Sequence, residues 1–276
     1  MRWDTLRGLP GETADGRAVA QTTGMGVMTI TGLKTAFAVL WGMTVAMPAY
    51  ADPFSEIDFS QIKNVIFEGE SSKINVTTSN DGPAMLHVVK SGLRAQSCRP
   101  IVETRVIQAS LYVNLQFKQS DTGVTRRCSV LLETQLPTDV SVSIHQQATI
   151  ASFKGHFQGI SVAGTNSQVS LIGQTETFNL ESSNSVVTID GKVNALEIDA
   201  NRTIAALRLT DLSETRTLRI HADNLVAEIG LPESAQIKHN IRATISAFAS
   251  SIPLQQEADL ALDIRSELMS GKLFAF

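Results

Sequence analysis

The sequence predicts an all-β protein whose central part is a single-stranded β-solenoid (β-helix), in which successive coils of the chain stack on one another. Two observations predict this fold. A short pattern of apolar, polar and apolar residues returns along residues 160–247 at intervals of 18 to 22 residues, and it alternates like a strand with one buried face. The two strands of each repeat stand too close for a helix between them, so each coil must pair in parallel with the next.

Two sets of strands alternate along the repeat, and each set supplies one apolar column of the predicted core. Because side chains alternate between the two faces of a strand, the apolar residues of each set should point to the same interior. Aligned coil by coil, the columns consist of Ile160, Phe178, Leu196 and Leu218 for the first set, and of Val169, Val187, Leu207, Ala227 and Ile245 for the second.

An asparagine follows each strand of the first set and marks a corner of the coil. The Asn side chain hydrogen-bonds its own backbone and tolerates left-handed conformations, which suits a corner. Stacked Asn side chains can also bond one another between coils. The predicted corner ladder, which is structural, consists of Asn166, Asn184, Asn201 and Asn224.

The outward positions of the aligned strands carry charges that follow one another between coils. The alignment places Glu197 beside Arg219, and Arg208 beside Glu228. The strand spacing of about 4.8 Å would let each pair meet. Exposed pairs of this kind contribute about 0–1 kcal/mol each, so they support the register more than the stability.

One outward column is a candidate polar binding site, made of Glu181, Asp199 and His221. Stacked carboxylates could bind a cation or serve a polysaccharide lyase or hydrolase. The simpler interpretation is a solvated strand face on which Asp199 pairs with His221. The sequence has no Gly-x-Ser-x-Gly, phosphate-loop or His-Glu-x-x-His motif, so it predicts no catalytic residue, metal site or cofactor.

The N-terminal part, residues 1–51, is predicted to be a leader that is removed. Leu33–Ala46 is an apolar run too short for a membrane span of about 20 residues. It is followed by Ala49-Tyr50-Ala51, a small-x-small cleavage signature. We therefore expect cleavage after Ala51, translation from Met1, Met25 or Met28, and no stable membrane span afterwards; the alternative is an uncleaved N-terminal anchor.

The composition after removal of the leader excludes some classes of partner. The whole chain has a net charge of −4, and the leader takes away more basic than acidic residues. Such a domain is not expected to bind nucleic acid. The leader also contains both tryptophans and Tyr50, which leaves Tyr112 as the one Tyr or Trp and disfavours a lectin surface that stacks on aromatic rings.

Residues 52–157 read as short strands without a strict repeat, separated by turn residues such as Asn80-Asp81-Gly82-Pro83. This segment is predicted to be an irregular N-terminal β cap on the regular coils of residues 158–250, and residues 251–276 a C-terminal cap. The strands expected in the N-terminal segment are Asn64–Glu68, Lys73–Thr77, Leu86–Lys90, Leu111–Phe117, Cys128–Glu133, Val140–His145 and Thr149–Phe153.

The two cysteines of the chain, Cys98 and Cys128, are predicted to form a disulfide. An even cysteine count in an exported chain favours a structural bridge, which stabilises by about 2–4 kcal/mol. A redox pair or a metal site is disfavoured because the chain has no Cys-x-x-Cys spacing and no nearby His.

Three stretches follow the order found in a known family. They are Phe67-Glu68-Gly69 with Ile74-Asn75-Val76, the strand Leu131–Gln135 closing at Leu136-Pro137, and the coils after Ile144. In hydrophobic and turn pattern, about residues 60–250 resemble the bacterial "putative adhesin" family of exported domains of unknown function, related to the head domains of autotransporter adhesins. The resemblance implies a right-handed β-solenoid.

Together these features predict an exported, non-enzymatic β-solenoid in the periplasm or on the surface of a Gram-negative bacterium. Its expected role is adhesin-like binding of an envelope or extracellular protein or glycan, or that of an envelope scaffold, and its edges offer a route to self-association. The alternative is a carbohydrate-active enzyme that uses Glu181 and Asp199.

Overall fold

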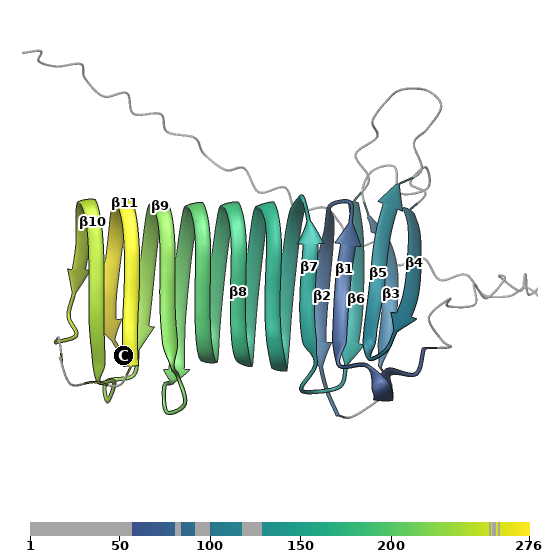
Figure 1. Ribbon diagram of the computed structural model, residues 1–276, viewed down its shortest axis with the longest axis horizontal. Coiled ribbons are helices and arrows are strands. Elements are labelled where there is room, and N and C mark those ends of the chain that lie inside the picture. Colours follow the sequence, from purple (N-terminus) through teal and green to yellow (C-terminus); the bar gives the residue numbers. More distant parts are fainter. Residues whose placement is uncertain are drawn as a thin grey trace, which may run out of the picture. The chain divides into compact units, whose positions relative to one another are not determined.

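A computed structural model of the protein describes residues 57–80, 84–91, 100–117, 129–253, 255, 258 and 260–276. Within these residues the chain is all-β, with one 3-10 turn, η1 (Phe59–Gln61), and one strongly curled sheet (Figure 1). The strands are β1 (Asn64–Gly69), β2 (Ser72–Thr78), β3 (Met85–Ser91), β4 (Pro100–Ile107), β5 (Ser110–Phe117), β6 (Ser129–Leu136), β7 (Ser141–Gln146), β8 (Ala148–Asp211), β9 (Thr217–Leu231), β10 (Ile237–Ser250) and β11 (Leu260–Ala275).

Parallel pairing between successive coils of the chain builds the sheet. Ser141 of β7 is in register with Gly159 of β8, and Ala195 of β8 is in register with Thr217 of β9. The second step is four residues longer because residues 212–216 form a loop between β8 and β9. The repeat seen in the sequence is therefore the length of one coil, and the extra residues are accommodated at a corner.

The N-terminal strands continue this stack instead of forming a separate cap. β1 lies between β5 and β7, and β2 lies between β6 and β8, all in parallel. The stack ends where β3 pairs antiparallel with β6 and β4 with β5. The edge-closing strands are thus β3 and β4. Strand β4 has no counterpart among the strands expected from the sequence, because it begins at a proline and most of its side chains are exposed, as on an edge.

At the other end of the stack, the prediction that residues 251–276 form a C-terminal cap is wrong about their position. Strand β11 lies between β9 and β10, so the outermost strand is β10. The burial of the two strands explains this order. Leu260, Leu262 and Ile264 of β11 are buried, whereas most side chains of β10 are at least partly exposed. The more apolar strand occupies the position with a neighbour on both sides.

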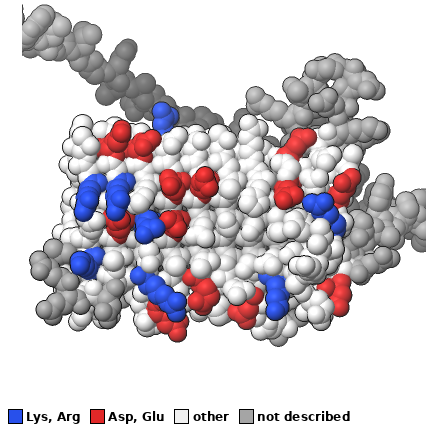
Figure 2. All heavy atoms as spheres, in the orientation of Figure 1, with Lys and Arg blue, Asp and Glu red and all other residues white. Residues whose placement is uncertain are grey.

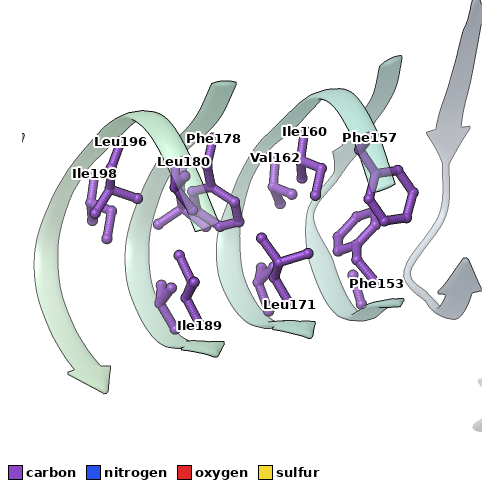
Figure 3. Packing of buried hydrophobic residues seen from close by; sticks show 14 of the residues in the cluster. Phe153, Phe157, Ile160, Val162, Leu171, Phe178, Leu180, Ile189, Leu196 and Ile198 are labelled. Carbon is purple, nitrogen blue, oxygen red and sulfur yellow. The ribbon is translucent and has the colours of Figure 1, made fainter. Parts of the chain in front are cut away.

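The core runs along the whole stack, with side chains of both strand sets pointing into it (Figure 3). The first predicted column is confirmed where Leu196 pairs with Leu218. The second is wrong from Leu207 onward, because Leu207 pairs with Ile229 and Ala227 pairs with Ala205. A shift of two residues keeps the same face of a strand inward, so alternation alone could not detect it.

The end of the second predicted column is also wrong. Ile245 pairs with Leu268 of β11, and 64% of its surface is exposed. Its neighbour Ser246 is in register with the buried Met269, although Ser246 itself is exposed on the outermost strand. The pattern of apolar, polar and apolar residues is therefore displaced by one position here, which reverses the face of each side chain.

Glycines allow the coils to approach one another at one corner. Gly155, Gly173 and Gly191 lie one coil apart and all have positive φ, which is +133° at Gly173. A Cβ atom on Gly173 would collide with the backbone carbonyl oxygen of Gly155, and one on Gly191 with that of Gly173. The space that a side chain would need at these glycines is filled by backbone atoms. Backbone cannot move aside as a flexible side chain can.

Replacing Gly173 by alanine should therefore destabilise the stack. We expect Gly173→Ala to lower the free energy of unfolding by at least about 1–3 kcal/mol, the usual cost of a non-glycine residue in such a conformation. Urea unfolding followed by circular dichroism measures the effect. The matched control is Gln174→Ala, at the exposed neighbouring position in the same strand, which should change stability by less than about 0.5 kcal/mol. Equal stability of the two variants would contradict the close approach.

Candidate functional site

Charged side chains form rows along one face of the stack, where acidic and basic residues follow one another from coil to coil (Figure 2). In one row Glu197, Arg219 and Asp263 are in register, and in the next row Asp199, His221 and Arg265 are in register. The rows follow from the parallel pairing, because residues in register lie about 4.8 Å apart.

The first row contains the ion pair that the sequence predicts. Arg219 Nη1 donates a hydrogen bond of 3.0 Å to Glu197 Oε1. The second predicted pair is wrong, because Arg208 is in register with Gly230. Arg208 instead lies over the ring of Phe276, with its guanidinium carbon 4.5 Å from the ring centroid, and Glu228 faces Lys272 at 3.5 Å. The same two-residue shift that moved the core column causes this difference.

The candidate polar column brings Asp199 and His221 into adjacent coils, but the closest carboxylate to His221 belongs to Asp263. His221 Nε2 lies 3.6 Å from Asp263 Oδ2. Glu181 precedes Asp199 by one 18-residue repeat in β8. The column is a partly exposed strand face, and its histidine is drawn toward the intercalated strand β11, which the sequence alignment could not place.

Asp263 is the centre of the best-connected polar cluster on this face. It accepts hydrogen bonds from Asn240 Nδ2 at 2.9 Å and forms an ion pair with Arg265 at 2.9 Å. Its side chain is 20% exposed. Burial opposes ionisation of this carboxyl, but the hydrogen bond and charge of Arg265, with help from His221, outweigh burial and hold the pKa of Asp263 below its usual value.

The predicted corner residues lie on another side of the coil. Asn184 Nδ2 donates to Asn166 Oδ1 at 3.1 Å. In the following coil the register places Arg202, not Asn201, beside Asn224. Asn201 is therefore one residue away from the ladder, and a cation takes the corner position.

These corner residues form one wall of a groove that the sequence alignment did not predict. The groove has a volume of about 940 Å³ and is lined by residues of β6, β2, β8, β9, β11 and β10. Its floor is a buried column that includes Ser185 and Thr203, whose hydroxyls lie 2.9 Å apart. The opposite wall is a row of exposed aliphatic side chains: Ile150, Val186, Ile204 and Val226. The sequence contained one local sign of this row, an apolar residue two positions after Asn184 and two positions after Asn224.

The predicted disulfide and the predicted leader concern residues outside the described ranges. Cys98 and Cys128 both lie outside them, as does the predicted leader. Across the described ranges, no group of three His, Cys, Asp or Glu side chains could hold a metal ion. A search of the same ranges for a long apolar helix of membrane-spanning length found none.

Comparison with known proteins gives structural neighbours only. No family model matches the chain, and no curated protein matches it in sequence. Among solved structures, a "putative cell adhesion protein" from Clostridium sporogenes is 8% identical, with 80% of this chain and 96% of that chain covered and a TM-score of 0.32. A "putative adhesin" from Bacteroides fragilis is 12% identical, with 78% and 92% covered and a TM-score of 0.32.

A "putative lipid binding protein" from Parabacteroides distasonis is 11% identical, with 78% of this chain and 94% of that chain covered and a TM-score of 0.28. The names of these neighbours describe those proteins. Scores of this size are too low to assign a function to this chain, so a function has to be argued from its own residues.

The Asp263 cluster makes stability depend on pH. A carboxyl whose pKa is lower in the folded than in the unfolded protein stabilises the fold above its unfolded pKa of about 3.9, and this contribution is lost as the pH falls through the lower folded value. We expect Asp263→Asn to lower the urea midpoint at pH 7. Near pH 3, most of the difference in midpoint between this variant and the unchanged protein should disappear. Asp199→Asn, at an exposed position in the neighbouring row, is the control and should change neither midpoint. If Asp263→Asn lowered the urea midpoint by the same amount at both pH values, the ionisation of Asp263 could not be the source of the stabilisation.

Proposed function

We propose that this protein is an exported, non-enzymatic binding protein with a right-handed β-solenoid fold like that of the "putative adhesin" domains it resembles, and that its groove is the binding surface. The observation that carries the proposal is the row of aliphatic side chains along the groove that are exposed to solvent. Val186, Ile204 and Val226 are 40%, 53% and 48% exposed. Contiguous exposed apolar surface is typical of interaction sites, and the groove volume lies in the range of ligand pockets.

The groove is better suited to binding than the polar column. Charges on the polar face are partly satisfied by one another, as in the pairs of Arg219 with Glu197 and of Arg265 with Asp263. Neither Glu181 nor Asp199, the residues of the enzymatic alternative, lines the groove. A ligand in the groove would cover apolar surface that water now contacts, and covering it is favourable by about 25 cal/mol for each Å².

Binding of a neutral apolar fluorophore tests the groove. We expect N-phenyl-1-naphthylamine to become strongly fluorescent when it is titrated with the purified protein, and Ile204→Asp to weaken this binding by about tenfold or more, because a carboxylate on the wall would have to be desolvated. The matched control is Ile172→Asp, at a position in the same strand that is 56% exposed and outside the groove. Circular dichroism confirms that both variants are folded.

Equal binding by Ile204→Asp and Ile172→Asp, or no binding by the unchanged protein, would overturn the groove as the binding surface. Loss of binding by Ile204→Asp alone would support it, because both variants add the same charge to the same strand.

Export is tested separately with the complete chain and its own N-terminal segment. We expect the mature protein to begin at Asp52, since cleavage after Ala51 fits the small-x-small rule. Mass spectrometry of the protein recovered from cell fractions measures this. Protease treatment of intact cells, compared with cells whose outer membrane has been opened, distinguishes the surface from the periplasm. A full-length protein in the cytoplasmic fraction would contradict export.

A further inference from the structure

The polarity of the groove changes along its length. The corner wall runs in register through Arg202 of β8, Asn224 of β9, Leu268 of β11 and Ile245 of β10. Before Arg202 the same wall is made of asparagines. The corner wall is therefore polar from the middle coils of β8 as far as Asn224, and it is apolar at Leu268 and Ile245 toward β10, where Ser246 and Ser270 also line the groove.

The floor changes in the same direction. Thr203 of β8 is followed in register by Leu225 of β9 and Met269 of β11. All three are nearly fully buried, with 3%, 2% and 4% of their surface exposed. Hydroxyl side chains thus line the floor up to Thr203, and a leucine and a methionine line it beyond that point. The floor therefore becomes apolar at Leu225 of β9, and the corner wall becomes apolar one strand later, at Leu268 of β11.

The charges of the groove all have one sign. Among the residues that the structure describes, Lys73 and Arg202 are the two charged ones that line it, and no carboxylate does. Arg202 is exposed, and the structure gives it no ion pair within the described ranges. Arg202 stands where the part of the floor lined by hydroxyl side chains meets the part lined by Leu225 and Met269. An Arg guanidinium that lies free beside apolar surface is suited to a carboxylate or phosphate attached to a hydrocarbon chain.

We propose that the groove binds an anionic single-chain amphiphile, with its acidic head group at Arg202 and its hydrocarbon chain directed along Leu225, Met269 and Leu268 toward β10. From the strand of Arg202 to β10 there are three strand steps, or about 14 Å, which suits a medium-length acyl chain. This inference rests on the proposed function and adds to it the class of ligand and its direction in the groove.

Other extended ligands fit the groove less well. A peptide that joins a sheet needs a strand edge with unpaired backbone groups. Along the proposed path of the ligand, β8, β9 and β11 are paired on both sides, and the edge of β10 lies only at the far end of the groove. A glycan is usually held by aromatic side chains, and the described part of the chain places none along the groove. Aliphatic side chains that continue from Arg202 toward β10 match a fatty acid better than either.

Competition between two ligands of the same chain length tests the proposal. Dodecanoate and 1-dodecanol are each titrated, below their aggregation limits, against N-phenyl-1-naphthylamine bound to the purified protein. We expect dodecanoate to displace the fluorophore at an approximately tenfold lower concentration, because its head group forms a charge-assisted hydrogen bond. Arg202→Gln should remove this preference, and Arg202→Lys should retain part of it.

Two further variants locate the ligand. Lys73→Gln, which removes the other cation of the groove, should leave the preference for dodecanoate unchanged, whereas Leu268→Ser should weaken dodecanoate and dodecanol by the same factor. Equal displacement by the acid and the alcohol from the unchanged protein, or a preference that persists in Arg202→Gln, would overturn this inference while leaving groove binding in place. If the fluorophore itself does not bind in the groove, the proposed function fails first.

Discussion

Parallel pairing in register between coils one repeat apart is the constraint on which the rest of the structure depends. It places equivalent residues of successive coils about 4.8 Å from one another, so that every feature of one coil becomes a column along the stack. The apolar core, the charged rows and the groove are all columns of this kind. It also allows extra residues only at corners, as in the loop between β8 and β9.

Both ends of the stack use the same arrangement. At one end the coil made by β1 and β2 lies between β5–β6 and β7–β8, and at the other end β11 lies between β9 and β10. The first and last described strands of the chain are therefore paired on both sides. A strand paired on both sides has no free row of backbone donors and acceptors, so this placement protects β1 and β11 from fraying.

The intercalation of β11 has a direct effect on both candidate surfaces. On the polar face it brings Asp263 to His221 and Arg265 beside them, which draws the histidine away from a simple pairing with Asp199. In the groove it supplies Leu268 and Met269, which make the last segment apolar. One strand therefore completes the charge network on one face and the hydrocarbon-like surface on another.

The sequence by itself determined most of the strands, though not β4, together with the length of the coil and the ion pair of Arg219 with Glu197, because alternation and a repeat of about 18 residues are local properties of the chain. The order of coils at the two ends, the two-residue shift at Leu207, the exposure of Ile245 and the groove were decided only by the tertiary structure. Alternation tells which face of a strand is buried but not which neighbour it faces. A shift of two residues or the insertion of a distant strand leaves the local pattern intact, so the competition for burial between β10 and β11 settles the arrangement.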